Sequence, residues 1–149
     1  MAQELRKARE DLTRLTHQIE LGKDPALGTG GAGARAFRAD EAITGSRIEN
    51  SIGRRLQRVP NDKSPRDWYD PKSGKVYDAA SPTPTKYFDK PGSFENWTGS
   101  IQAHFKKSGV DVVVVDIAQR GLNPVQAAKV KNYIASLPAS QRSRILILA

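Results

Sequence analysis

The sequence predicts an α/β domain in which helices flank a mixed β-sheet, preceded by an N-terminal helical arm. First, the run VDVVVVDI at 110–117 is continuously β-branched, which is typical of an interior strand covered on both faces. Second, RILILA at 144–149 follows a helical pattern, and strand, helix and strand at this spacing form a right-handed crossover with parallel strands. Third, two short strand-forming runs around Pro71-Lys72-Ser73-Gly74 predict a hairpin.

The composition favours a polyanionic partner. The 149 residues suit one ordinary domain, and 24 Lys and Arg against 16 Asp and Glu give a net charge of +8. Nucleic acid is the first candidate, with an anionic membrane surface as the alternative. Cysteine is absent, so any metal must bind oxygen or histidine. No run approaches the ~18 apolar residues of a membrane span, and the N-terminus lacks a signal-peptide core, so we expect no stable membrane insertion.

The N-terminal segment is expected to form a helix over residues 2–21. Its narrow apolar seam consists of Leu5, Leu12, Leu15 and Ile19. This seam could dock on the main domain or on another chain. Residues 22–36 are rich in Gly and Ala and predict a flexible linker. We therefore divide the chain into an arm with its linker, residues 1–40, and a main domain, residues 41–149.

Three further helices and one loop are predicted along the main domain. A helix is expected to begin near Gly45 and to end before Pro60, because apolar residues recur every four positions. Residues 81–92 contain three prolines and predict a stiff loop without regular structure. Ser93 is expected to cap a helix that ends at Gly109. A last helix should start at Asn123-Pro124, an N-cap followed by proline, and bury a stripe from Val125 to Leu137.

The hairpin brings two aspartates together. A four-residue loop pairs Trp68 with Tyr77 and Asp67 with Asp78. Directly opposed side chains lie roughly 4.5–5.5 Å apart at Cβ, where like charges are destabilising. A divalent cation would remove this repulsion, because Mg²⁺ binds one or two carboxylates with water and phosphate. The alternative is that Arg and Lys side chains pair with both carboxylates.

Glu49 has two possible roles. Ser46-x-x-Glu49 matches a capping box, in which the glutamate bonds to the N-cap amide. Glu49 also precedes the hairpin on a helix from which it could reach the acidic pair, with Gly53 one turn on allowing close approach. The two roles stay open at this point.

These residues resemble a known family. A helix with Glu, a hairpin with two acidic residues and a basic surface are similar to the PD-(D/E)XK nuclease plan. More closely, TGSRIENSIGRRLQR and RDWYDPKSGKVYDAASPTP resemble C-terminal toxin domains of contact-dependent growth inhibition proteins, several of which cleave tRNA. The resemblance covers roughly residues 44–149. It implies that the arm joins the toxin to a large secreted carrier.

The resemblance also implies site residues. Glu49, Asp67 and Asp78 would be the catalytic carboxylates and the ligands of a divalent metal, Mg or Zn. The lysine expected two residues after Asp78 is Ala80, so the motif departs from the family pattern. We take Lys86 as the relocated catalytic lysine. The alternatives are Lys75 and Lys90.

Basic residues near the acidic pair are expected to contact phosphates. They are Arg47, Arg54, Arg55 and Arg58 around the helix, and Lys72 and Lys75 on the hairpin. The two histidines, His17 and His104, are expected on separate helices far from the hairpin, and no role is assigned to them. Asp116 is either a fourth acidic group or an ordinary strand-end residue.

The sequence therefore predicts a toxin nuclease, a metal-assisted ribonuclease acting on tRNA. The resemblance implies that a large surface exoprotein delivers it into the cytoplasm of a neighbouring bacterium and that a cognate immunity protein protects the producer. One alternative is a DNase of the same fold. The other is a non-catalytic, basic nucleic-acid-binding module with structural acidic residues.

Overall fold

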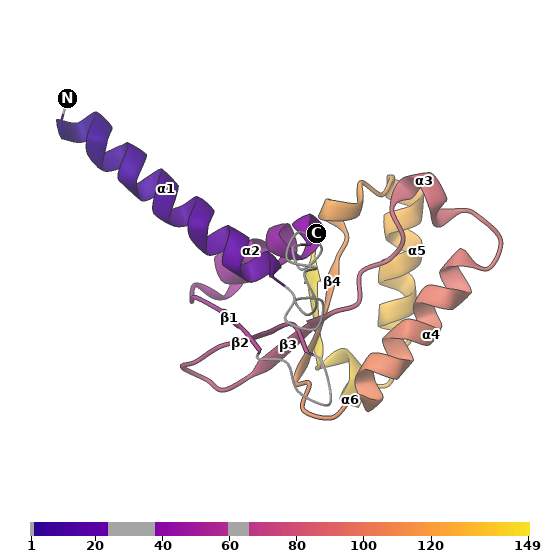
Figure 1. The fold of residues 1–149 in the computed structure, drawn as a ribbon. Coiled ribbons are helices and arrows are strands. Elements are labelled where there is room, and N and C mark those ends of the chain that lie inside the picture. The colour runs from indigo at the N-terminus through magenta and orange to yellow at the C-terminus, as the bar shows by residue number, and fades with distance from the viewer. Residues whose placement is uncertain (1, 24–37, 60–65) are drawn as a thin grey trace, which may run out of the picture.

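The computed structural model describes residues 2–23, 38–59 and 66–149, and confirms an α/β fold (Figure 1). The elements in chain order are α1 (Ala2–Gly22), α2 (Ala39–Ile52), β1 (Gln57–Arg58), β2 (Trp68–Tyr69), β3 (Val76–Ala79), α3 (Thr85–Phe88), α4 (Ser93–Lys106), β4 (Val112–Asp116), the 3-10 turn η3 (Ala118–Arg120), α5 (Pro124–Ala135), α6 (Ala139–Arg142) and β5 (Ile145–Leu148).

One mixed sheet of five strands organises the domain, in the order β1-β2-β3-β4-β5. The first three strands are antiparallel, whereas β3, β4 and β5 are parallel. The predicted hairpin register is confirmed, since Trp68 pairs with Tyr77 and Tyr69 with Val76. The crossover through α5 places β4 parallel to β5, as the apolar runs predicted. β4 is an interior strand of this sheet.

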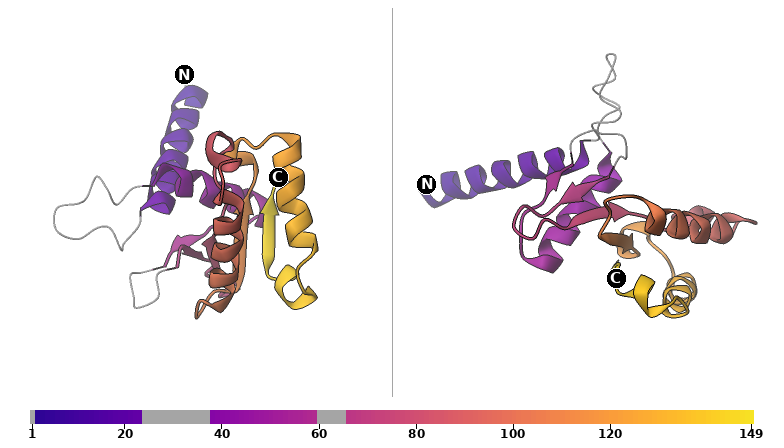
Figure 2. Two further views of the ribbon diagram at one scale, coloured as in Figure 1. Left: turned by 90° about the vertical axis from the view of Figure 1, so that its right-hand side faces the viewer. Right: turned by 90° about the horizontal axis from the view of Figure 1, so that it is seen from below.

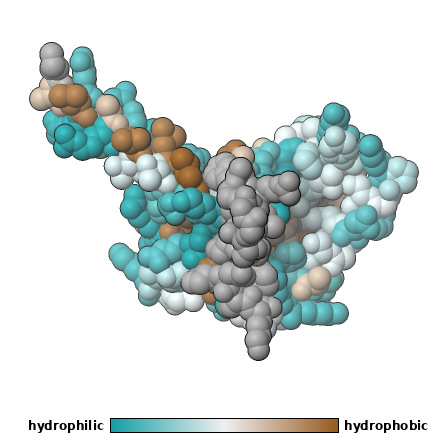
Figure 3. Space-filling model, in the orientation of Figure 1, coloured by the Kyte–Doolittle hydropathy of each residue, from teal (hydrophilic) through white to brown (hydrophobic). Residues whose placement is uncertain are grey.

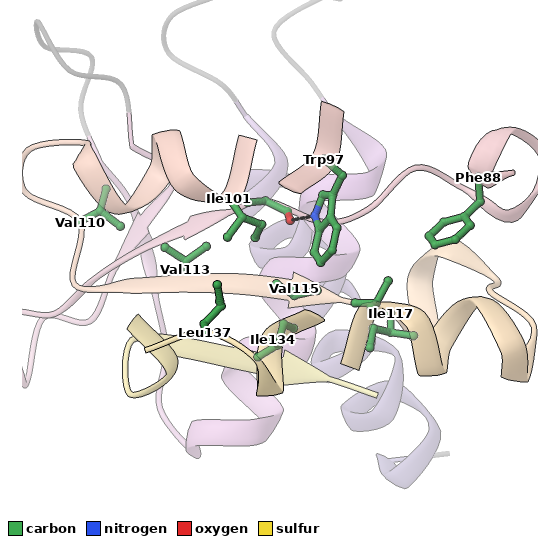
Figure 4. Close-up of a cluster of buried hydrophobic side chains, with 11 residues drawn as sticks. Phe88, Trp97, Ile101, Val110, Val113, Val115, Ile117, Ile134 and Leu137 are labelled. Atoms are coloured by element: carbon green, nitrogen blue, oxygen red, sulfur yellow. Dashed lines mark hydrogen bonds between the residues drawn. The ribbon is translucent and has the colours of Figure 1, made fainter. Parts of the chain in front are cut away.

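One face of the sheet is covered by α4 and α5 (Figure 2). In the view of Figure 4, Trp97 and Ile101 of α4 lie above β4, and Ile134 and Leu137 lie below it. All four belong to one cluster on this face of the sheet. The indole Nε1 of Trp97 donates to the Ala80 carbonyl at 2.7 Å, so this buried polar group is satisfied. The aromatic and β-branched residues of this cluster fix α4 above the sheet.

The opposite face packs against α1 and α2. Its cluster contains Leu21, Ile48, Leu56, Trp68, Tyr77, Val114 and Leu148. In β4, Val113 and Val115 point to the first cluster and Val114 to the second, which is the period-2 alternation of a strand buried on both faces. The Trp68 indole N–H donates to the Leu21 carbonyl at 2.8 Å.

The arm joins the domain at its C-terminal end. Leu21 is buried in the second cluster, while the N-terminal turns of α1 project from the rest of the molecule (Figure 1). The predicted apolar seam is exposed along this projection, where Figure 3 shows hydrophobic surface. Residues 24–36 of the expected linker lie outside the described part of the chain. Among the described residues, no helix has both the length and the apolar character needed to cross a bilayer.

Several helix boundaries differ from the sequence-based predictions. α2 begins at Ala39, so Ser46 and Glu49 lie inside the helix and the capping-box interpretation is wrong. Gly92 in the left-handed conformation precedes α4, and Ser93 is already helical. Residues 81–92 were expected to lack regular structure but include the one-turn helix α3, because all three prolines lie outside Thr85–Phe88. In α5 the predicted Asn123 N-cap with Pro124 in the first helical turn is confirmed, and the structure adds a capping box with Gln126, but Val125 is exposed.

A close helix-to-sheet contact predicts one stability effect. A Cβ atom at Gly45 would lie 3.1 Å from the Trp68 indole and 3.2 Å from Leu21 Cβ. The buried indole is held by its bond to the Leu21 carbonyl and has no room to move. We expect overpacking of about 1–3 kcal/mol to outweigh the ~1 kcal/mol helix-propensity gain of Gly45→Ala. Thermal unfolding should show a midpoint lowered by roughly 2–4 °C per kcal/mol.

Gly99→Ala is the matched control. Gly99 also lies in a helix, but a Cβ atom added there would have no neighbour within 4 Å. We therefore expect Gly99→Ala to raise the midpoint through helix propensity alone. Equal shifts of the two variants would contradict the packing described here.

Candidate active site

The structure brings the two hairpin aspartates together. Asp67 directly precedes β2, and Asp78 lies in β3 on the neighbouring strand. The charge of Asp78 and a hydrogen bond from its side chain are among the causes that raise the pKa of Asp67. Asp67 Oδ2 also accepts from the Ala79 backbone N–H at 2.8 Å, which fixes its orientation. The predicted carboxylate pair therefore exists, as the Trp68–Tyr77 register requires.

Three basic side chains surround this pair. Lys107 Nζ lies 2.7 Å from Asp78 Oδ2, and His104 Nε2 lies 3.4 Å from the same oxygen. Arg58 lies 3.8 Å from Asp67 Oδ1. His104 comes from the last turn of α4 and Lys107 immediately follows that helix. We call Asp67, Asp78, His104, Lys107 and Arg58 the hairpin cluster.

The pair is nearly closed to water, and this changes its protonation. The Asp78 side chain is 3% exposed and that of Asp67 is 15% exposed. Burial, the charge of Asp78 and the hydrogen bond shared with Asp78 raise the pKa of Asp67 to about 7, although Ala79 N–H and Arg58 act in the opposite direction. At neutral pH Asp67 therefore gains and loses a proton readily, as a general acid or base must.

The raised pKa reflects burial and the charge of Asp78, which together outweigh the opposing effect of the Arg58 guanidinium. Two facing carboxylates fit the oxygen-ligand preference of a divalent cation such as Mg²⁺. The predicted third ligand is not part of this set. In the described ranges, no three or more His, Cys, Asp or Glu side chains are grouped so that they could hold a metal ion. Any cation here would depend on the two aspartates, water and substrate.

Glu49 lies in a different environment from the hairpin cluster. Its Oε2 is 2.6 Å from His17 Nε2 and accepts from the Leu56 backbone N–H at 2.7 Å. Glu49 thus joins α2 to α1 and to the chain entering β1. The expectation that it reaches Asp67 and Asp78 is not met by these contacts. Gly53, four residues on, ends α2 in the left-handed conformation with φ 70°.

One of the two histidines corrects the sequence analysis. Both were expected far from the hairpin, yet His104 contacts Asp78, whereas the partner of His17 is Glu49 in α2. The sequence did contain a signal for the first contact. His104 and Lys107 are three residues apart at the end of one helix, so they share a face. Only the packing of α4 on the sheet directs that face towards Asp78.

Of the predicted lysines, Lys86 lies in α3, where its Nζ is 5.4 Å from the Tyr87 ring centroid and the side chain is exposed. Lys75 is exposed on the hairpin, and Lys90 Nζ lies 4.8 Å from the same Tyr87 ring. The lysine that contacts a predicted carboxylate is Lys107. Sequence reasoning missed it because it lies 29 residues after Asp78 and is contributed by another element.

Three of the predicted phosphate-binding arginines have carboxylate partners inside the protein. Arg47 pairs with Asp116 at 3.2 Å and Arg54 with Asp70 at 2.6 Å. Arg58 Nη1 is 3.1 Å from a Glu41 oxygen and stacks over the Trp68 ring. Arg55 and Lys75 are exposed.

The two fully buried aspartates beside these arginines are structural. Burial acts to raise the pKa of Asp70, but hydrogen bonds from Lys72 N–H and Ser73 and the charge of Arg54 outweigh it and lower the pKa. Asp70 thereby fixes the hairpin turn. Asp116 accepts from Thr44, Arg47 and the Gln119 backbone, which ties α2 to the end of β4. These contacts favour the strand-end interpretation of Asp116.

Comparison with known proteins gives one informative similarity. No family model matches the chain, and no curated protein matches its sequence. The fold is similar to that of the CdiA-CT toxin from Burkholderia pseudomallei E479, solved in complex with its cognate CdiI immunity protein. The TM-score is 0.60 at 25% sequence identity, over 75% of this chain and 100% of the toxin.

The similarity supports a toxin function. It agrees with the predicted resemblance to C-terminal toxin domains of contact-dependent growth inhibition. The match spans the whole of the solved toxin chain, so the α/β fold described above corresponds to the fold of that toxin. The carboxylate pair lies within this type of fold.

Proposed function

We propose that the chain is a toxin nuclease that cleaves RNA, with tRNA as the substrate. The observation that carries the proposal is the Asp67–Asp78 pair with Lys107 at 2.7 Å, in a fold similar to a CdiA-CT toxin. Carboxylates beside an ammonium group are suited to phosphodiester cleavage, which needs proton transfer and stabilisation of negative charge. The net charge of +8 favours association with a nucleic acid.

Residues of the hairpin cluster have specific chemical roles in this proposal. Asp67, with a pKa near 7, takes a proton from the attacking water or from the ribose 2′-hydroxyl. Lys107 stabilises charge that develops on the phosphoryl oxygens. Asp67 and Asp78 are the residues that would hold a divalent cation, which supplies Lewis acidity when bound. Asp78 also positions Lys107 and His104 through its Oδ2 atom.

The proposal includes the biological setting that the family resemblance implies. A large surface exoprotein would deliver the toxin into the cytoplasm of a target bacterium. The solved toxin forms a complex with its cognate immunity protein. A corresponding immunity protein would neutralise this toxin in the producing cell. An acidic surface on that partner would speed its capture of this basic chain.

A second candidate function is non-catalytic nucleic-acid binding. The observation that favours it is the closed set of ion pairs around Asp78, whose side chain is 3% exposed. Structural ion-pair networks also shift pKa values, so such a network does not require catalysis. In this case Lys107 and His104 would only neutralise Asp78.

A cleavage assay separates these functions. Purified protein is incubated with total tRNA or with plasmid DNA, each with Mg²⁺ and with EDTA. We expect tRNA fragments at neutral pH and intact plasmid. Loss of cleavage in EDTA would support metal assistance, whereas equal cleavage would support direct attack by the 2′-hydroxyl. Cleaved plasmid with intact tRNA would identify a DNase, and both substrates intact would favour the binding module.

A further inference from the structure

A second basic site lies where the arm crosses the end of α2. It is an open cleft of about 450 Å³, lined by Arg9, Glu10, Thr13, Arg14, His17, Glu49 and Arg55. We call it the arm cleft. Arg9, Thr13 and His17 are spaced four residues apart, so they lie along one face of α1. Glu49 and Arg55 come from the other side, at the end of α2 and just beyond it.

The His17–Glu49 contact holds the two sides of the cleft together. Glu49 Oε2 accepts from Leu56 N–H, so the carboxylate is fixed before it meets His17. His17 Nε2 lies 2.6 Å from this oxygen, and the two side chains are 22% and 15% exposed. The pair therefore bridges α1 and α2 within the lining of the cleft. Arg9, Arg14 and Arg55 line the same cleft.

The charges at the rim are available to a ligand. Among the described residues, no hydrogen bond or ion pair occupies the guanidinium groups of Arg9 and Arg55. Arg14 is paired with Asp11 at 3.0 Å on an exposed helix face, and such pairs are worth about 0–1 kcal/mol. This differs from Arg47 and Arg54, whose charges are committed to buried aspartates. The cleft thus offers three guanidinium groups against two carboxylates, and one of these, Glu49, is already held by His17 and the Leu56 N–H.

Guanidinium groups bind phosphate in a bidentate manner, and several around one groove favour a nucleic-acid backbone over a single small anion. A second groove, lined by Gly53, Arg54, Arg55, Pro71 and Lys72, shares Arg55 with the arm cleft and extends the basic surface towards the hairpin. Arg55 therefore links the arm to the hairpin that carries the candidate active site. A backbone bound in the arm cleft would continue along this surface.

The geometry points to the arm cleft as a phosphate-backbone binding site for the nucleic-acid substrate, so that α1 is part of the substrate-binding surface and not only a tether. This inference deepens the proposed nuclease function and depends on it for the identity of the ligand. The arm gains a specific role, since Arg9 and Arg14 contribute contacts that the α/β domain lacks. The phosphate contacts position the substrate and do not read its sequence.

The test measures tRNA binding without cleavage. Fluorescently labelled tRNA is titrated by anisotropy with the Asp67→Asn chain at several salt concentrations. Arg9→Glu and Arg55→Glu are added separately, one from each side of the cleft. The matched control is Arg6→Glu, which makes the same charge change at an exposed position of α1 outside the cleft. Circular dichroism and thermal unfolding check that each variant is folded.

We expect Arg9→Glu and Arg55→Glu each to raise the Kd about tenfold, and Arg6→Glu to change it less than threefold. Each lost phosphate contact should reduce the slope of log K against log salt by about 0.7–0.9. Unchanged binding of the two cleft variants, an equal loss in Arg6→Glu, or no tRNA binding by the parent chain would overturn the inference. Cleavage by the wild-type chain is measured in parallel. If the wild-type chain cleaves tRNA but the cleft variants bind tRNA as tightly as their parent, only this inference fails. If the cleft variants bind tRNA more weakly but the wild-type chain does not cleave it, only the nuclease proposal fails.

Discussion

Asp67→Asn is expected to lower tRNA cleavage by at least about 100-fold, the usual effect of removing a general base. Asparagine keeps the acceptor for the Ala79 N–H and can donate to Asp78, but it cannot take up a proton. Initial rates at neutral pH under single-turnover conditions measure the effect. Asp70→Asn serves as a comparison, since Asp70 fixes the turn through Lys72 and Ser73 and its loss should lower stability before it lowers the rate per folded molecule.

Asp67→Asn is also expected to stabilise the fold at alkaline pH. The pKa of Asp67 rises from 3.8 to about 7 on folding. Between roughly pH 4 and 7 the folded chain therefore binds one more proton than the unfolded chain, and the free energy of unfolding falls as pH rises through this window. Three pKa units correspond to about 4 kcal/mol, which is an upper bound because solvent and the neighbouring cations screen the pair.

Chemical denaturation at pH 5 and pH 8 tests this sign. We expect Asp67→Asn and wild type to differ little at pH 5, and the variant to be more stable by about 1–2 kcal/mol at pH 8. The groups that face Asp67 are Asp78 and Arg58, with Lys107 and His104 beyond Asp78. An Asn variant that is less stable at pH 8 would show that the ionised carboxylate is favourable in the folded state.

Lys107→Met is expected to affect both stability and activity. Its removal leaves Asp78, with a side chain only 3% exposed, facing Asp67 with one cation fewer. Breaking a buried ion pair costs about 3–5 kcal/mol, and since Lys107 is itself 30% exposed we expect about 2 kcal/mol at pH 8. Cleavage should fall about 100-fold because a charge-stabilising group is lost.

Two companion variants make the Lys107 result interpretable. Lys106→Met removes a neighbouring exposed lysine and should leave the rate and the stability nearly unchanged. In the double variant Lys107→Met/Asp78→Asn the unpaired charge is gone, so stability should recover while cleavage stays low. Recovery of cleavage in the double variant, or full activity of Lys107→Met, would rule out the role assigned to this lysine.

The sequence predicted the sheet better than the sites. The β-branched run of β4, the hairpin loop and the Asn123-Pro124 cap are local signals, so β2 to β5, the hairpin register and the crossover were predicted correctly. The two-residue strand β1 was missed, because the helix expected to continue to Pro60 ends at Ile52. The Asp67–Asp78 contact followed from that register alone. The start of α2 was missed because Ala39–Thr44 carries no cap signal, and Arg38 makes no side-chain cap bond.

The partners of the two carboxylates could not be predicted from local patterns. Lys107 and His104 reach Asp78 only because α4 packs across the sheet through Trp97 and Ile101. Glu49 lies on a helix whose position depends on α1, and the contact with His17 spans 32 residues of sequence. Long-range packing therefore supplied Lys107 as a direct ion-pair partner of Asp78, which no local pattern indicates.

Cell-based expression tests the central claim most directly. The wild-type chain and the Asp67→Asn variant are induced to equal levels in the cytoplasm of a bacterium without an immunity protein, and tRNA integrity is followed on denaturing gels together with growth. We predict that wild type cuts tRNA and arrests growth, whereas the folded Asp67→Asn protein does neither. Growth arrest with cleaved tRNA in cells that contain only the Asp67→Asn chain would contradict the assignment of the carboxylate pair as the catalytic centre.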